Sequence, residues 1–432
     1  MKAIASGKLN IRKRPLPEFL TLFVFFMPFF LSFFQDFLRL PALVKYTIDV
    51  AWVMATALLF LRRKIQFDKR IVPFLIYIGI FFLYTLFFYI LNFQSPFYFL
   101  WGFRNNFRFY FAFILFCVFL YKEDIKMCFK FLDVVFYIDA VVAFFQFFVL
   151  GYKWDFLGGI FGADTGCNAY TMVFFTIVIS KSVLQYMNKE EKLWLCATKC
   201  VIALVIAAMS ELKFFFVVFI VMLVMATLFT SFSMRKIVLI VVASIIIMFA
   251  GSILTEIFGE NSTLSFERII ELVTTESYSS TEDLGRFTAI SKLSNSVVVD
   301  PVNQLFGLGL GNCDTSSFAV CNSEFYQIYS HLNYTWFSSA FLFLELGLVG
   351  LGIYLFFFIM CFVFSWNQLR KDYENKLYYQ LAMIISVVCV LLTFYNSSLR
   401  FEVAYMIYFV LALPVICSKS DIRYQRRLNV HT

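Results

Sequence analysis

Three residues in the last third of the chain have types and spacing that suit acid–base chemistry on a charged substrate. His331 is one of only 2 histidines in the 432-residue sequence, and it lies shortly before a long apolar run. Arg286 lies upstream in the same polar segment, and Glu345 lies within the apolar run. Histidine exchanges protons near neutral pH, and arginine donates paired hydrogen bonds to phosphate oxygens. We take His331, Arg286 and Glu345 as candidate catalytic residues. The alternative for His331 is an interfacial side chain in an aromatic belt.

A second set of charged residues would suit binding of an anionic group such as a phosphate. Arg104 and Arg108 are four residues apart, so a helix would place both guanidinium groups on one face. Glu211 and Lys213 lie in a short polar turn between two apolar runs, and Arg400 precedes the last run. The alternatives are anchoring to lipid headgroups for the arginines and a local ion pair for Glu211 and Lys213.

The composition predicts a membrane protein. The chain is 61% hydrophobic and only 15% charged, with a mean hydropathy of +0.81, whereas soluble domains are about one quarter charged. The net charge of +8 comes from short basic tracts between apolar runs, which argues against a nucleic-acid partner. The ten cysteines show no metal-ligand spacing, so we expect neither a metal site nor a cofactor. Whether Cys313 and Cys321 form a disulfide is left open by the sequence.

The apolar segments predict an all-α, polytopic protein with about twelve transmembrane helices, since a bilayer core needs about 20 apolar residues per helix. We divide the chain into residues 1–255 with spans one to nine, a long exterior loop at 256–335, and residues 336–432 with three spans and a tail. The predicted spans are 18–36, 43–61, 71–92, 105–121, 131–150, 168–187, 194–210, 213–232, 237–255, 336–364, 377–395 and 402–418.

The distribution of lysine and arginine predicts the orientation. With both termini in the cytoplasm, 26 of the 36 basic residues fall inside and ten fall outside. Basic residues favour cytoplasmic connectors, so this orientation is preferred. Seven of the eight candidate residues then lie in or close to exterior segments, and the eighth, Glu345, lies within a predicted span.

The long exterior loop has its own helix and turn signals. Residues 264–273 predict one helix, and a capping box at 279–282 predicts a second helix that runs from Leu284 to Asp300-Pro301. Gly307, Gly309 and Gly311 predict an extended backbone that another segment approaches closely. Three further acids fall within predicted spans, and we leave open whether they form a proton path or make separate helix-packing hydrogen bonds: Asp49, Asp133 and Asp139.

Several of these motifs together resemble the bacterial O-antigen polymerase and ligase superfamily. The resemblance rests on GR at 285–286, GLGLG at 307–311, His331 with Asn333, ELGLVGLG at 345–352, and GGIFGADTGCNAY at 158–170. Two features differ from that family. Leu332 separates the histidine from the asparagine, and Lys213 stands where relatives carry arginine, which loses bidentate geometry.

The resemblance implies a glycosyltransferase of the bacterial cytoplasmic (inner) membrane. One undecaprenyl-diphosphate-linked repeat unit would supply a hydroxyl that attacks the anomeric carbon of another, and the growing polymer would result. His331 would act as the base, and Arg286, Lys213, Arg104 or Arg400 would bind the leaving diphosphate. We expect a metal-independent reaction, with a chain-length regulator and a flippase as candidate partners. We prefer a polymerase to a ligase of the same superfamily, and the alternative class is a lipid-linked oligosaccharide flippase or transporter.

Overall fold

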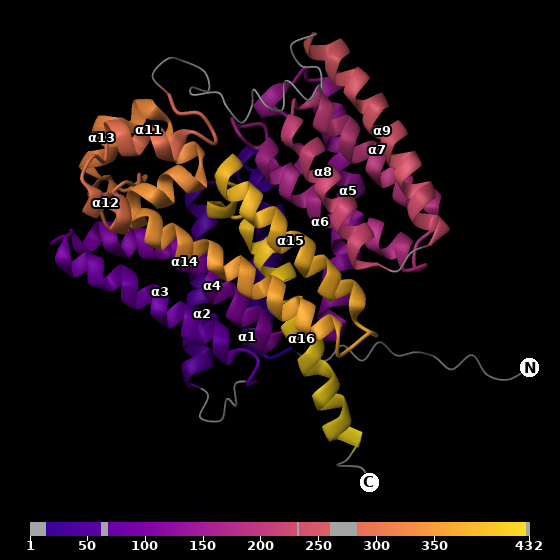
Figure 1. The fold of residues 1–432 in the computed structure, drawn as a ribbon, viewed down its shortest axis with the longest axis horizontal. Helices are drawn as coiled ribbons and strands as arrows, with labels where there is room; N and C mark the ends of the chain where they lie inside the picture. Colours follow the sequence, from indigo (N-terminus) through magenta and orange to yellow (C-terminus); the bar gives the residue numbers. More distant parts are fainter. Residues whose placement is uncertain (1–13, 62–67, 231–232, 260–282, 429–432) are drawn as a thin grey trace, which may run out of the picture.

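The chain folds as a bundle of long helices with three short helices at one end (Figure 1). A computed structural model describes residues 14–61, 68–230, 233–259 and 283–428, with side chains up to residue 419. Within these ranges every regular element is a helix. The predicted helix at 264–273 and the capping box at 279–282 lie outside the described residues.

Seven helices among the described residues are long and apolar enough to cross a membrane. The fold is therefore that of a helical membrane protein. The seven are α2 (Tyr46–Leu61, with a 3-10 turn before it), α3 (Val72–Leu91), α5 (Lys122–Phe148), α6 (Asn168–Met187), α9 (Met234–Phe258), α14 (Ser338–Leu369) and α15 (Lys376–Tyr395).

Five further helices coincide with the remaining predicted spans. Four are shorter apolar helices, and α4 is long but carries two arginines. Each of the twelve predicted ranges thus overlaps one helix, although the number that cross the membrane stays a prediction. The five are α1 (Leu16–Phe26), α4 (Pro96–Phe119), α7 (Leu193–Met209), α8 (Lys213–Phe229) and α16 (Ala404–Leu428).

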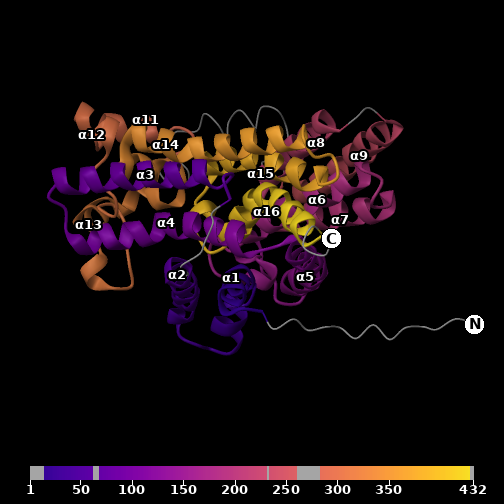
Figure 2. The same cartoon turned by 90° about the horizontal axis from the view of Figure 1, so that it is seen from below.

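Central and peripheral helices differ in which faces they bury. Every residue of α16 from Ala404 to Ser418 is buried, and α6 is buried along most of its length. By contrast, α3 and α9 expose large apolar side chains on their outer faces, such as Ile80 and Met248. Helix α14 packs against α15, α4 against α16, and α7 against α9, whereas α1 and α2 pair at one side of the bundle (Figure 2). Exposed apolar faces of this kind suit contact with lipid.

The connectors between helices gather at two ends of the bundle. At the first, the loop end, hydrogen bonds tie the α3–α4 connector and α4 to residues 310–315, and tie α14 to the α15–α16 connector. At the second, the basic end, an ion pair joins Lys122 to Glu374, and Gln380 donates to the carbonyl of Phe229. The long polar segment therefore belongs to the end that the charge distribution predicts to be exterior.

Helix α14 is broken at Gly347, whose φ of 68° and ψ of −173° are not helical. The glycine-rich stretch at 307–311 lies against this break. The backbone N–H groups of Leu308 and Gly309 donate to the carbonyls of Leu344 and Glu345, at 2.8 and 2.9 Å. A Cβ atom at Gly347 would overlap the backbone of Leu305, and one at Gly307 would overlap that of Glu345. The predicted close backbone approach is confirmed at Gly307, which lies against the broken helix, and at Gly311, which lies against Tyr98 and Gly102 of α4.

Three short helices follow in the described part of the long loop: α11 (Ala289–Ser296), α12 (Pro301–Phe306) and α13 (Glu324–Tyr329). The predicted helix from Leu284 is wrong at its start, because the N–H of Leu284 donates to the carbonyl of Leu332 and holds this stretch as a loop. Asp300-Pro301 begins α12, with the Asp300 carboxylate accepting from the N–H of Asn303.

We predict that Gly347→Ala destabilises the protein by about 1–3 kcal/mol, since alanine disfavours a positive φ and its Cβ would collide with the loop. Gly352→Ala, in the same helix, is the matched control, because a Cβ there meets nothing within 4 Å. Thermal unfolding in detergent should show a lower midpoint for the first variant only. Equal midpoints would contradict a tightly packed break.

Candidate functional site

A chain of polar contacts at the loop end joins α2, α4, the long loop and the α15–α16 connector. Arg104 pairs with Asp49 at 2.5 Å and donates to the Asn105 side chain at 2.6 Å. Asn105 donates in turn to Asp314 at 2.6 Å, and Arg400 lies 3.6 Å from the other oxygen of Asp314. Four elements distant in sequence are therefore held together by one charged network.

Arg108 anchors a second set of contacts, deeper in the bundle. Its guanidinium, which is 3% exposed, pairs with Glu402 at 2.9 Å and donates to the carbonyl of Arg400 at 2.8 Å. The second oxygen of Glu402 accepts from the Tyr170 hydroxyl at 3.2 Å. Helices α4 and α6 are thereby tied to the connector that carries Arg400.

Arg104 and Arg108 contact different carboxylates on different elements. The prediction of a shared phosphate site requires both guanidinium groups to reach one ligand. In this structure one binds Asp49 and the other binds Glu402. Their use as a phosphate-binding pair stays a prediction, and it would require an ion pair to open.

Glu345 is fully buried and lies directly before the break in α14. Its Oε1 accepts from the backbone N–H of Cys313 at 3.4 Å, while its Oε2 is buried without a hydrogen-bond partner. Arg400 lies close by, with its guanidinium carbon 3.1 Å from the centre of the Phe341 ring, one turn earlier in α14. A buried, unsatisfied carboxylate oxygen is costly and therefore marks a place where a proton or ligand would bind.

Tyr395, at the end of α15, contacts both Arg286 and Phe214, the residue that follows Lys213. Arg286 donates to the carbonyl of Tyr395 at 2.9 Å, and its guanidinium carbon lies 4.2 Å from the centre of that ring. Phe214 stacks on the same ring at 3.8 Å. Lys213 pairs with Glu211 at 3.1 Å, so the predicted turn between α7 and α8 contains an ion pair.

His331 lies on the surface of the loop end. Its Nδ1 is 3.1 Å from the carbonyl oxygen of Ile328. A carbonyl oxygen can only accept, so the neutral ring carries its proton on Nδ1 and leaves Nε2 free to take up a proton. The Leu284–Leu332 backbone hydrogen bond joins the segment of Arg286 to that of His331. Glu345 is buried while His331 is exposed, so the two do not share one open surface.

The sequence reasoning missed two of the three carboxylates that hold the arginines, Asp314 and Glu402. Asp314 follows the glycine-rich stretch, and Glu402 stands two residues after Arg400. An acid near an exterior arginine at the start of an apolar run is the signal that would have indicated Glu402. The side-chain amide of Asn105 and the ring of Tyr395 carried no such signal, since their roles depend on tertiary contacts.

The remaining open questions from the sequence concern the acids within spans and the cysteines. Asp133 contacts Lys181 and Lys199, and Asp139 accepts from the N–H of Ile160 at 2.8 Å. Together with the Asp49–Arg104 pair, these separate partners favour helix packing over a proton path. Both thiols of the long loop, Cys313 and Cys321, are free.

Among the described residues no group of three or more His, Cys, Asp or Glu side chains is placed to hold a metal ion. Comparison with models of known protein families gave no match, and no curated protein matches the chain. The arguments for function therefore rest on the chemistry of the loop end.

We predict that Arg108→Ala destabilises the protein by about 3–5 kcal/mol, because it leaves the Glu402 carboxylate buried and unpaired. Glu374→Ala is the matched control, since the Lys122–Glu374 pair has side chains 24% and 80% exposed. That exposed pair should contribute about 0–1 kcal/mol. Unfolding of both variants in detergent would measure the difference, and similar losses would argue against a buried ion pair.

Proposed function

We propose that this protein is a membrane-embedded glycosyltransferase that polymerises oligosaccharide repeat units linked to polyprenyl diphosphate. In this reaction an acceptor hydroxyl attacks the anomeric carbon of the donor sugar. The bond from that carbon to the diphosphate oxygen breaks, the diphosphate leaves with the electron pair, and the hydroxyl proton passes to a base.

One observation carries the proposal: basic side chains, a buried carboxylate and a histidine from separate elements lie at the same end of an apolar bundle. The glycine-rich stretch contacts the broken α14 at Glu345, and the same loop supplies Asp314 to Arg400. A lipid-linked substrate needs this combination, because its isoprenoid tail lies in the bilayer while its diphosphate and sugar lie at the surface.

His331 is the proposed base. Its Nδ1–Ile328 hydrogen bond leaves Nε2 to accept a proton, and its exposure allows a sugar to approach. Glu345 is a second titratable group, and its buried Oε2 lacks a hydrogen-bond partner. We assign Glu345 to proton exchange, or to a hydrogen bond with a substrate hydroxyl, at the break in α14.

Arg286 and Lys213 are the proposed diphosphate-binding residues. Arg286 contacts the Tyr395 ring and is half-buried. Lys213, whose side chain is 34% exposed, directly precedes Phe214, which stacks on the same ring. Positive charge fixed at this place would stabilise the negative charge that develops on the leaving diphosphate. We assign Arg104, Arg108 and Arg400 to positioning, since each contacts a carboxylate that a different segment of the chain supplies.

The proposal includes twelve membrane spans, cytoplasmic termini and a loop end on the outer face of the bacterial cytoplasmic membrane. The position of the polar loop at the end with fewer basic residues supports this orientation. A flippase is less favoured, because a transporter of this class would be expected to lack a long polar loop at one end of the bundle.

Deletion and complementation would test the proposed activity. A strain that lacks the protein should lose its ladder of surface glycans and keep single repeats. Free lipid-linked polymer would indicate a ligase, and repeats held at the inner leaflet would indicate a flippase. Plasmid-borne His331→Ala or Arg286→Ala should restore little or no ladder, since loss of a general base costs about 100-fold or more in rate.

Gln327→Ala is the control for these variants, because Gln327 is exposed in the same loop and carries no proposed role. It should restore the full ladder at the same membrane level of protein. A normal ladder from His331→Ala would exclude His331 as the base, and a normal ladder from Arg286→Ala would exclude Arg286 from diphosphate binding.

The role of Lys213 can be separated from that of the ion pair in its turn. Lys213→Arg should retain most activity and Lys213→Ala should lose about tenfold or more, because the required feature is positive charge. Glu211→Gln breaks the same pair but keeps the cation. Initial rates of chain extension would distinguish these cases, and equal losses in Lys213→Ala and Glu211→Gln would indicate a structural pair only.

A further inference from the structure

The basic end of the bundle contains a pocket that the proposed reaction does not use. It has a volume of about 540 Å³ and lies where the turn after α6 and the start of α7 meet the start of α9. Three basic side chains line it, namely Lys189, Lys192 and Arg235. They come from two segments more than 40 residues apart, so the fold creates this cluster.

The acidic side chains of the pocket do not cancel this charge. Glu191 is paired with Lys199 at 2.8 Å and accepts from the Ser182 hydroxyl, so its charge is already matched by a lysine behind the pocket. Glu190 lies on the surface. Partial desolvation raises the pKa of its carboxyl, and this effect outweighs that of the nearby Lys376, which lowers the pKa. Three cations therefore face one remaining carboxylate.

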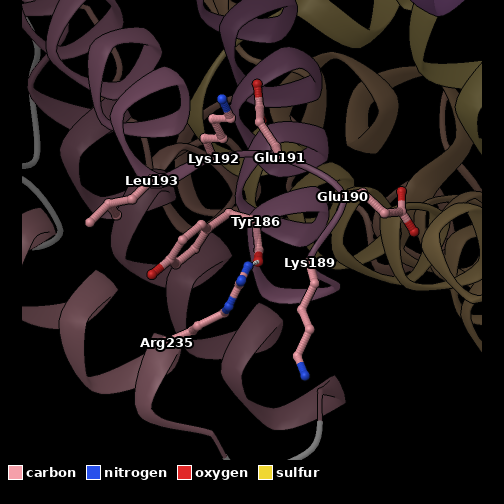
Figure 3. A pocket seen from close by; sticks show the side chains of 7 residues that line it. All are labelled: Tyr186, Lys189, Glu190, Glu191, Lys192, Leu193 and Arg235. Carbon is pink, nitrogen blue, oxygen red and sulfur yellow. Dashed lines mark hydrogen bonds between the residues drawn. The ribbon is translucent and has the colours of Figure 1, made fainter.

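The position of Arg235 is fixed by the end of α6. Its Nη1 donates to the carbonyl of Tyr186 at 3.2 Å, and its guanidinium carbon lies 5.5 Å from the centre of the Tyr186 ring. Lys189 extends on the same side as Arg235, whereas Lys192 and Glu191 extend on the other side and Glu190 extends away from both (Figure 3). An anion that enters on this side would meet the two cations first.

Two helices begin beside the pocket, and neither start is neutralised. Helices α7 and α9 have no acidic residue in the first turn, and no side chain caps their first N–H groups. The N-terminus of a helix carries partial positive charge and attracts anions. This potential adds to that of the three basic side chains.

The surroundings of the pocket place it at the edge of the apolar surface. Trp194 and Met234, adjacent to pocket residues, are 62% and 71% exposed. The exposed face of α9 continues with apolar residues such as Ile237 and Val241. Tryptophan and apolar side chains next to lysine and arginine are typical of the headgroup region of a bilayer, where basic pockets bind anionic lipids.

We propose that this pocket binds the phosphate headgroup of an anionic phospholipid, with the acyl chains lying along α9. The same chemistry would suit the phosphate of a soluble compound, and the apolar surroundings favour the lipid. This inference is independent of the proposed glycosyl transfer, since it concerns the opposite end of the bundle.

Native mass spectrometry of the full-length protein in detergent would test it. The probes are dioleoylphosphatidylglycerol, which is anionic, and dioleoylphosphatidylcholine, which is zwitterionic. The triple variant Lys189→Gln, Lys192→Gln and Arg235→Gln should lose about tenfold or more in affinity for the anionic lipid, since each basic residue near a headgroup contributes to binding. The matched control replaces three exposed lysines of the same end by glutamine: Lys126, Lys130 and Lys371. It should bind as the parent protein does.

Three outcomes would overturn the proposal: equal loss in both triple variants, equal affinity for the two lipids, or displacement of the anionic lipid by inorganic phosphate with similar affinity. The last would assign the pocket to a soluble phosphate compound. Lys189→Glu provides a second test should the triple variant fail to fold, because this side chain is exposed and extends on the side of Arg235. It should weaken binding of the anionic lipid several-fold, and unchanged binding would exclude the site.

Discussion

The break in α14 requires that backbone groups inside an apolar bundle find partners outside their own helix. At Gly347 the helix is interrupted, and the carbonyls of the preceding residues lose their usual N–H donors. The N–H groups of Leu308 and Gly309 and the hydroxyl of Tyr84 replace them, with the last donating to the carbonyl of Leu346 at 2.6 Å. Because these replacements come from the long loop and from α3, the break fixes the loop on the bundle and sets the position of Glu345.

The buried ion pairs complete this assembly. The charge distribution predicts that the loop end is exterior, where arginines would run against the usual charge bias. Each of three arginines at this end has a carboxylate within 4 Å. Removal of charge from water is costly, so a buried ion pair adds little to the net free energy of folding. Its main effect is to favour the one arrangement of helices and loops in which both charges have a partner. Arg108 and Glu402 join α4 to the last connector, and Asp314 brings the long loop to Arg400.

The two ends of the bundle use positive charge differently. At the loop end the guanidinium groups are held by carboxylates, carbonyls and aromatic rings, which suits fixed positioning of a reactive group. At the basic end the cations around Arg235 surround an open pocket next to exposed apolar side chains. The first arrangement suits chemistry on a substrate and the second suits binding of a membrane component, and our two proposals follow this division.

The sequence by itself determined the helical membrane class and the approximate positions of the twelve apolar helices, because apolar composition is a local property. It placed some helix ends nine or ten residues away from the structure, as at the end of α1 and the start of α4. It also indicated close backbone approach at Gly307 and Gly311, because glycine alone tolerates such contact and such backbone angles. Tertiary structure decided the partners: Asp49 for Arg104, Glu402 for Arg108, Tyr395 for Arg286, and the break at Gly347 for the glycine-rich stretch. No local pattern specifies these contacts, since each joins segments that only the packed bundle brings together.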